Sequence, residues 1–173
     1  MTDRHLVIVD IETTGLDSEQ HVPLEIAAIN IDTDEILHFV PWVDSHTLAR
    51  ADYDALRINR YFERGVYKDM LSADETMSHY HALWKMLRGN TFAGANPRFD
   101  AQMLELATGW EPSWHYRLAD VSAYVAGSLK MYPANIAGLL ECCRLLAVTN
   151  DEPHSALADA KATAQCFFQA QAR

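Results

Sequence analysis

Hydrophobic runs near the start of the chain predict β-strands. Residues 6–9, Leu-Val-Ile-Val, are uninterrupted and mostly β-branched, as in a strand buried on both faces, and Asp10 ends the run. Two further strands are predicted over residues 25–31 and 36–43. The polar stretch 32–35 between them suits a hairpin turn, so the fold is expected to begin with an antiparallel meander.

Helical spacing follows the predicted strands. Between about residues 47 and 88, hydrophobic residues recur at three- and four-residue steps, most clearly at Met77, Tyr80, Leu83, Trp84 and Leu87. A short strand is predicted over residues 91–95. Asn96-Pro97 then places a capping residue before a proline, which is typical of a helix start.

The remaining elements and the chain length predict one α/β domain. A weak strand is expected around residues 117–121, followed by helices over about 136–146 and 155–170. Strands first, then alternating helices and strands, indicate a mixed β-sheet flanked by α-helices. With 173 residues, 49% of them hydrophobic, the chain can bury one core but not two ordinary ones, so a single domain is expected over residues 1–173.

Composition excludes several classes of protein. No run approaches the ~18 apolar residues that span a bilayer, and no signal-like segment opens the chain, so a cytoplasmic protein without membrane contact is expected. The three cysteines lack disulfide-framework or zinc-site spacing and are expected to be reduced. The formal charge of −10 argues against nucleic-acid binding by general electrostatic attraction. It is compatible with a nuclease, because a site that works through divalent cations must concentrate carboxylates.

A pair of carboxylates follows the first predicted strand. Asp10 and Glu12 are two residues apart, so in extended geometry both side chains leave the same face and can share a metal ion. An isolated pair of this kind is usually two solvated turn carboxylates. The next residues, Thr13-Thr14-Gly15-Leu16, change that interpretation, because hydroxyl donors and an isolated apolar wedge suit the end of an oligonucleotide.

Three further residues are ambiguous when each is considered alone. Asp100 lies one turn into the helix that starts at Asn96-Pro97, where an acidic residue often only compensates the helix dipole. His154 precedes the last predicted helix, and Asp159 falls in its early turns. Five residues correspond to about 140° of helical rotation, so these two side chains cannot share a helical face. His154 is therefore expected to reach a site from the loop.

Together these residues form three ordered motifs: Asp10-Ile11-Glu12-Thr13-Thr14-Gly15, Asn96-Pro97-Arg98-Phe99-Asp100, and His154-Ser155-Ala156-Leu157-Ala158-Asp159-Ala160. They resemble the motifs of the DnaQ-like exonucleases, and within that family the DEDDh subgroup. The sister subgroup carries tyrosine four residues before the last aspartate, where this chain has Ser155. The chain departs from the common pattern at Ser155, where arginine is frequent, and at Ala147, where glycine often follows the penultimate helix. The departure at Ser155 is expected to alter contacts with phosphate.

The resemblance implies a ribonuclease-H-like fold and a 3′-to-5′ exonuclease that releases nucleoside 5′-monophosphates. By the same resemblance, the metal ligands are Asp10, Glu12, Asp100 and Asp159, the general base is His154, and the residues contacting the terminal nucleotide are Thr13, Thr14 and Leu16. The implied cofactors are two divalent metal ions, Mg²⁺ or Mn²⁺. Carboxylate oxygens are the ligands such cations prefer, and two cations about 4 Å apart can activate water and stabilise the leaving 3′-oxygen.

The expected substrate is the 3′ end of a single-stranded nucleic acid. DNA is slightly favoured, because the first motif resembles proofreading and repair members of the family more than the oligoribonuclease branch. RNA trimming is the close rival. A non-catalytic nucleic-acid-binding domain is the third reading, but such a domain would be expected to lose at least one of the five catalytic-type residues. A homodimer or an association with a polymerase is compatible with the sequence.

A stretch that mixes basic and aromatic residues has two interpretations. Its members are Arg57, Arg60, Tyr61, Phe62, Arg64, Tyr67 and Lys68. They could follow a nucleic-acid strand by phosphate contact and base stacking. Alternatively, they form an amphipathic helix whose aromatic residues are core and whose basic residues are solvated. The sequence leaves both interpretations open.

Overall fold

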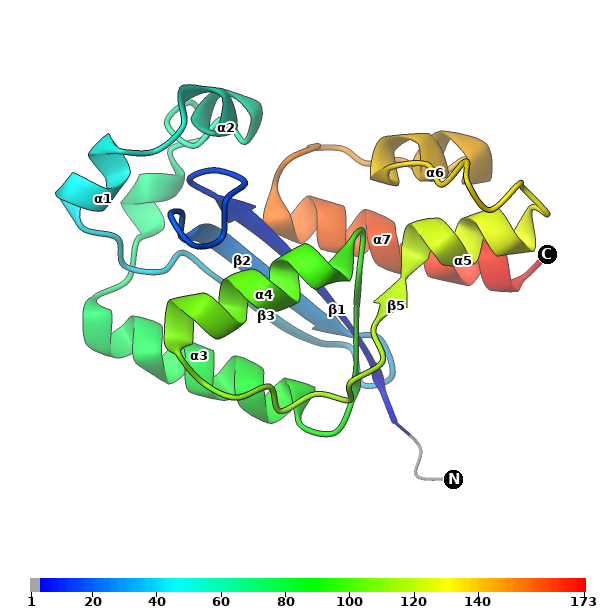
Figure 1. The fold of residues 1–173 in the computed structure, drawn as a ribbon, viewed down its shortest axis with the longest axis horizontal. Coiled ribbons are helices and arrows are strands. Elements are labelled where there is room, and N and C mark those ends of the chain that lie inside the picture. Colours follow the sequence, from blue (N-terminus) through cyan, green and yellow to red (C-terminus); the bar gives the residue numbers. More distant parts are fainter. Residues whose placement is uncertain (1–3) are drawn as a thin grey trace.

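A five-stranded mixed sheet with the strand order β3-β2-β1-β4-β5 forms the centre of the protein (Figure 1). In the computed structural model, which describes residues 4–173, the strands are β1 (Leu6–Thr13), β2 (Pro23–Asn30), β3 (Glu35–Phe39), β4 (Thr91–Gly94) and β5 (Ala119–Asp120). β1 pairs antiparallel with β2 and parallel with β4, so it is the central strand. The predicted antiparallel start and mixed α/β sheet are confirmed.

Helices cover both faces of this sheet (Figure 1). They are α1 (Ser45–Ala49), α2 (Tyr53–Ile58), the 3-10 helix η1 (Val66–Asp69), α3 (Ala73–Leu87), α4 (Pro97–Thr108), α5 (Val121–Ser128), α6 (Leu139–Leu146) and α7 (Ala156–Gln171). Helices α3 and α4 pack on one face, and α5, α6 and α7 pack on the other. Among the described residues, no helix is long and apolar enough to cross a membrane.

The central strand β1 supplies both cores and the first motif. Val7 and Val9 point into the core shared with α3 and α4, whereas Ile8 points into the core shared with α5 to α7. Side chains alternate along a strand, so Asp10 and Glu12 project from the same face as Ile8. The prediction that this strand ends at Asp10 is wrong, because pairing with β2 continues to the end of β1. The register shifts between Glu12 and Thr13, which is a β-bulge beside the carboxylates.

The helical region predicted over residues 47–88 is broken into separate short helices. Polar caps begin several of them: Asp44 accepts backbone hydrogen bonds at the start of α1, and Ser72 forms a capping box with Glu75 at the start of α3. Gly65, with φ of 71°, precedes η1. Periodicity alone missed these breaks, because each cap stops or restarts the backbone ladder without changing the spacing of apolar residues.

Other elements also differ from the sequence predictions. The third strand ends at Phe39 instead of residue 43. Helix α5 was not predicted, because its eight residues are mostly apolar and give no polar face from which a helical period can be recognised. Helix α6 begins at Leu139, three residues later than expected. The three cysteines are buried and free, as predicted.

Candidate active site

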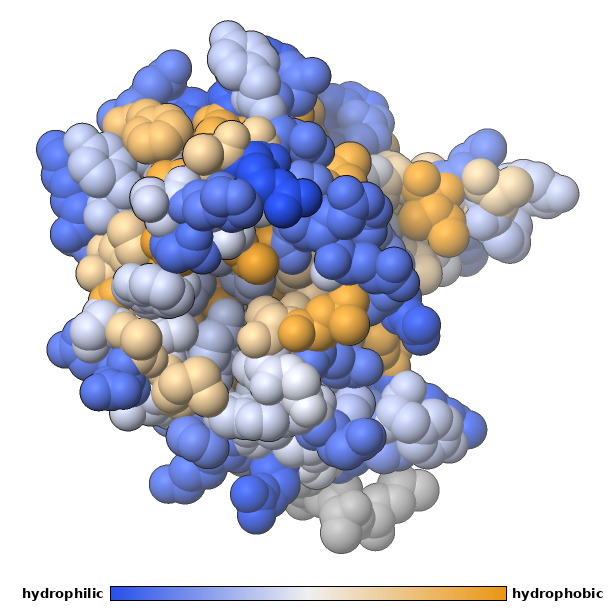
Figure 2. Space-filling view, turned by 60° about the vertical axis from the view of Figure 1, so that its left-hand side comes forward, coloured by the Kyte–Doolittle hydropathy of each residue, from blue (hydrophilic) through white to orange (hydrophobic). Residues whose placement is uncertain are grey.

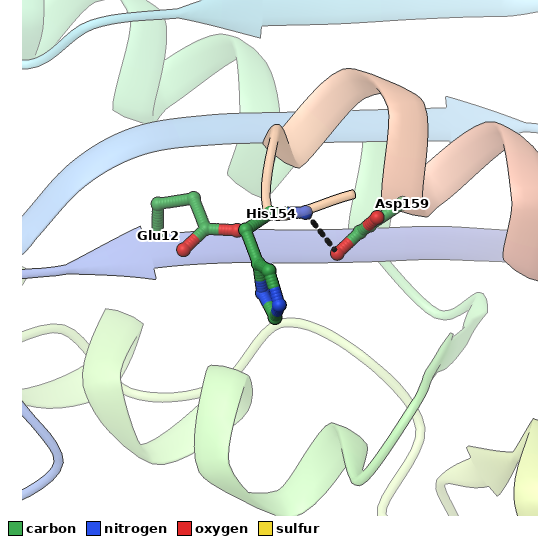
Figure 3. A group of neighbouring side chains, drawn as sticks. All are labelled: Glu12, His154 and Asp159. Carbon is green, nitrogen blue, oxygen red and sulfur yellow. Dashed lines mark hydrogen bonds between the residues drawn. The ribbon is translucent and has the colours of Figure 1, made fainter. Parts of the chain in front are cut away.

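Glu12, His154 and Asp159 converge although they come from opposite ends of the chain (Figure 3). Each offers one possible metal-ligand atom, and these three atoms lie within 4.8 Å of one another. Glu12 extends from β1, Asp159 from the first turn of α7, and His154 from the loop just before α7. His154 therefore reaches the site from a loop, as the 140° argument from sequence required.

The backbone of His154 is held on both sides. Its N–H donates to Asp159 Oδ2 at 3.2 Å, the bond drawn in Figure 3, and its carbonyl accepts from Arg64 Nη1 at 3.2 Å. Its φ of 62° lies in the left-handed region, which is uncommon for a residue other than glycine. Such a conformation persists only where surrounding contacts maintain it. These two hydrogen bonds are such contacts.

Asp100 joins the site through the start of α4. The pairing of β4 with β1 is limited to the first part of β1, residues 6–8. Strand β1 therefore continues beyond the end of β4 at Gly94. The first turn of α4 then lies along this extension. Asp100 is buried there, and hydrogen bonding from the backbone of Ile11 and from its own backbone favours its ionised form. Repulsion from Asp100 in turn raises the pKa of Asp10.

The four carboxylates share an unfavourable electrostatic environment. Burial raises the pKa of Asp10 and Asp100 well above the usual range for aspartate, and for Asp10 repulsion from the other carboxylates adds to this. The pKa of Glu12 is raised to about 7, first by burial and then by repulsion from Asp159 and Glu25, with Arg64 opposing the shift. Burial also raises the pKa of Asp159, against hydrogen bonds that include one of 2.6 Å from the side-chain amide of Asn150.

This donor set fits divalent metal ions. Several carboxylates confined in a poorly solvated space repel one another, and a bound cation would remove that repulsion. Oxygen donors are the ligands that Mg²⁺ and Mn²⁺ prefer. The four predicted ligands are therefore both of the residue type that these cations prefer and in a place where a bound cation would relieve repulsion.

A cavity of about 610 Å³ opens beside Glu12 and His154. It is lined by Ile11, Glu12, Thr13, Leu16, Asp52, Tyr53, Asp54, Ala55, Ile58, Asn59, Phe99 and His154. Helix α2 forms one wall, and Leu16, which is 83% exposed, lies at its edge. The face that carries α1 and α2 shows hydrophobic patches set among hydrophilic surface (Figure 2).

The two threonines of the first motif direct their hydroxyls into the turn. Thr13 lines the cavity, and its Oγ1 donates to the carbonyl of Gly15 at 2.7 Å. Thr14 is buried, and its hydroxyl contacts His21 Nδ1 at 3.1 Å and accepts from the Val22 N–H at 3.0 Å. Among the predicted nucleotide-contacting residues in the described chain, Leu16 is the one that projects freely.

The basic and aromatic stretch does not form the single amphipathic helix that one interpretation required. Helix α2 ends at Ile58 and turns follow. Tyr61 and Arg64 are withdrawn from the surface, whereas Phe62 and Tyr67 are exposed and their ring centroids lie 5.8 Å apart. Contact of the exposed members with a nucleic-acid strand stays a prediction.

Sequence reasoning missed several residues of the site. Phe99 lines the cavity, and its position next to Asp100 inside the second motif was a usable signal. Asn59 and Asn150 had no such signal, because they approach the site only through the folded chain. Arg64 was noticed, but as a surface cation.

The strand order of the mixed sheet and the carboxylates grouped at its central strand agree with the ribonuclease-H-like fold that the motifs imply. Residues 7–167 match the model of the exonuclease family RNase_T. The chain therefore belongs to this family. The family and enzyme class predicted from the three motifs are confirmed. No curated protein matches the sequence.

Solved structures of exonuclease I resemble this fold. Escherichia coli exonuclease I matches with a TM-score of 0.76 at 16% identity over 99% of this chain and 41% of that one. Its complex with a dT13 oligonucleotide gives 0.74 at 18% identity, over 96% and 41%. Exonuclease I from Methylocaldum szegediense gives 0.68 at 18% identity, over 98% and 41%. This chain thus spans about two fifths of the length of these proteins.

Proposed function

We propose that this protein removes nucleotides one at a time from the 3′ end of single-stranded DNA and releases nucleoside 5′-monophosphates. The observation that carries the proposal is the convergence of Glu12, His154 and Asp159, with Asp10 and Asp100 near them and with Glu12 and His154 lining a cavity. A cavity of about 610 Å³ is within the range of small-ligand sites and suits a terminal nucleotide.

DNA is the proposed substrate because of what the similar structures contain. Two Escherichia coli exonuclease I structures that match this fold hold dT13 and dA16 oligonucleotides. The resemblance of the first motif to proofreading and repair enzymes points the same way. RNA remains the alternative substrate for the same site.

We propose that Asp10, Glu12, Asp100 and Asp159 hold two divalent metal ions, Mg²⁺ or Mn²⁺. When bound, these ions supply positive charge to the scissile phosphate and lower the pKa of water. The carboxylates themselves act as oxygen donors, and their raised pKa values mean that cation binding must displace protons near neutral pH.

His154 is proposed to accept the proton from the attacking water. Its ring lies beside Glu12 and Asp159, and its backbone is fixed by hydrogen bonds, so the direction in which the side chain leaves the backbone is set before substrate arrives. Leu16 and Phe99 are proposed to contact the terminal base from the edge of the cavity, with Thr13 beside them. Thr14, as a member of the same turn, is proposed to hold Leu16 in place.

End-labelled substrates test these proposals together. Purified protein is incubated with single-stranded DNA, duplex DNA and RNA of one sequence, each with Mg²⁺, Mn²⁺ or chelator. We expect mononucleotide release from single-stranded DNA with either metal and none with chelator. A blocked 3′ end should stop digestion. Rapid cutting of circular single-stranded DNA would identify an endonuclease, and faster release from RNA would move the substrate to the alternative.

A single exonuclease unit over residues 1–173, a cytoplasmic location, and a homodimer or polymerase partner all remain predictions. Sedimentation of the purified chain, alone and with DNA, would test the homodimer.

A further inference from the structure

Arg64 makes a set of contacts that no other arginine of the described chain shares. Its guanidinium donates to both carboxylate oxygens of Glu25, from Nη1 at 2.8 Å and from Nη2 at 2.9 Å. Nη1 also donates to the backbone carbonyls of Asn59 and His154, each at 3.2 Å, so its two hydrogens are shared among three acceptors. Nε lies 3.5 Å from Glu152 Oε1. The side chains of Arg64 and Glu25 are 10% and 3% exposed, so this is a desolvated pair.

These contacts join three segments that are distant in sequence. Glu25 lies on β2, Asn59 ends α2 beside the cavity, and His154 belongs to the loop between α6 and α7. Glu25 is itself fixed by a second hydrogen bond, of 2.9 Å, to His38 Nε2. A planar guanidinium offers several donors in a rigid fork, so one residue can hold all three segments in register.

The contact with His154 bears on the site directly. The loop turns through a left-handed residue at His154, and its two backbone polar groups are used on opposite sides, one by Asp159 and one by Arg64. Loss of the bond to Arg64 would leave the carbonyl side of this strained residue unsupported. The direction of the imidazole depends on that backbone conformation.

We propose that Arg64 is a positioning residue for His154, which it holds by binding the backbone carbonyl of His154 while anchored to Glu25. This inference rests on the proposed role of His154 as general base. Arg64 does not line the cavity, so it acts through the loop and not on the nucleotide.

Arg64→Lys is the informative change. Lysine keeps a positive charge beside buried Glu25, but a point-like ammonium cannot reproduce the bidentate pair together with the bond to His154. We expect kcat to fall by about 10- to 100-fold with KM within about 2-fold, because small misplacement of a catalytic group reduces turnover more than binding. Arg144→Lys is the matched control, since Arg144 on α6 is exposed and pairs with Glu141 three residues away. Its kinetics should equal those of the wild type.

A double-mutant cycle separates positioning from a general structural effect. If Arg64 acts through His154, Arg64→Lys should cause no further loss of kcat in the His154→Ala protein. A second readout is amide hydrogen exchange of residues 150–156, which should accelerate in Arg64→Lys and stay unchanged in Arg144→Lys. If Arg64→Lys folds poorly, the pair Glu25→Gln with Arg64→Gln removes both buried charges and should show the same kinetic loss.

Three results would overturn the inference. They are wild-type kcat in Arg64→Lys, an equal loss of kcat in the His154→Ala background, and unchanged exchange of the loop. Failure of the proposed general-base role of His154 gives a different result, because the His154→Ala protein would then keep full activity. In that case the exchange rate of residues 150–156 still decides whether Arg64 holds this loop.

Discussion

Glu12 on β1 lies directly opposite Glu25 on β2, yet the two carboxylates have opposite electrostatic environments. Glu25 is hydrogen-bonded to Arg64 and His38, and these partners lower its pKa despite its burial. Glu12 has no comparable hydrogen-bonded cation, and its pKa is raised to about 7. The fold thus neutralises Glu25 internally with Arg64, whereas Glu12 is a proposed ligand for a cation from solution.

The first prediction follows from the pKa of Glu12. Because its folded-state pKa of about 7 exceeds its ordinary value of 4.5, the folded protein holds a proton that the unfolded chain has already lost in this window. The free energy of unfolding of the metal-free protein should therefore fall as pH rises from 4.5 to 7. Groups with lowered pKa values, such as Glu25, change the free energy of unfolding at pH values below this window.

Thermal unfolding in chelator from pH 5 to 8 measures the effect. The Tm of Glu12→Gln should match that of the wild type near pH 5 and exceed it at pH 8. Each kcal/mol difference in the free energy of unfolding corresponds to about 2–4 °C in Tm. Mg²⁺ should raise the Tm of the wild type at pH 8, because a ligand that binds the folded state stabilises it. Parallel curves for the two proteins across this range would contradict the assignment.

The second prediction concerns Asp10 and Asp100. Asp10→Asn or Asp100→Asn should nearly abolish metal-dependent nuclease activity, since asparagine keeps the shape but removes the charge. Neither change should lower the Tm in chelator at pH 8, because each removes a source of repulsion within the acidic cluster. Rate and Tm are measured on the same preparations. Wild-type digestion by Asp10→Asn, with its metal requirement intact, would show that the site is misplaced.

The third prediction is that His154 acts as a base and not as a ligand. His154→Ala should reduce turnover by about 10²- to 10⁴-fold, the usual contribution of a positioned general base. Wild-type activity should fall on the acid side, because a protonated imidazole cannot accept a proton. Single-turnover rates from pH 5.5 to 9 and calorimetric Mn²⁺ binding provide the measurements. Lost Mn²⁺ binding in His154→Ala would make His154 a ligand, and an unchanged rate would remove it from catalysis.

The fourth prediction tests the close approach of β4 to β1. A Cβ atom added to Gly94 would lie 2.8 Å from the backbone carbonyl oxygen of Val9, which cannot move without shifting β1. Gly94→Ala should cost about 1–3 kcal/mol of stability, as overpacking usually does. It should also reduce activity, because Val9 precedes Asp10 and Gly94 leads into the helix that carries Asp100. Gly127→Ala, on α5 with open space around the added atom, is the control and should retain activity.

The fifth prediction uses Ala147, which ends α6 with φ of 54°, in the left-handed region. Left-handed backbone costs an L-residue about 1–2 kcal/mol, whereas glycine loses about 0.5–1 kcal/mol more conformational entropy on folding. Ala147→Gly should therefore raise stability by up to about 1 kcal/mol, detectable as an increase in Tm. A lower Tm would show that the methyl group of Ala147 contributes packing that outweighs the strain.

The fold was predictable where one physical signal dominates a segment. The apolar run of β1 and the periodic residues of α3, α4 and α7 all became elements of the expected type. Prediction failed where local capping competes with periodicity. The spacing of apolar residues from Thr47 to Arg88 predicts helix throughout, but the cap positions Asp52, Gly65 and Ser72 divide this segment. It also failed for α5, whose uniform apolarity carries no period.

The sequence by itself identified the family of this protein and the residues of its candidate site. Three ordered motifs identified the carboxylates and the histidine, because residue type and spacing within a motif are local properties. The tertiary structure decided how those groups are charged and held. Glu12 and Glu25 are both glutamates in strands, and they differ because Arg64 reaches one of them from a distant segment. Burial, repulsion and the bond from Arg64 to His154 arise only when β1, the turn after α2 and the loop before α7 meet, and no local pattern specifies that meeting.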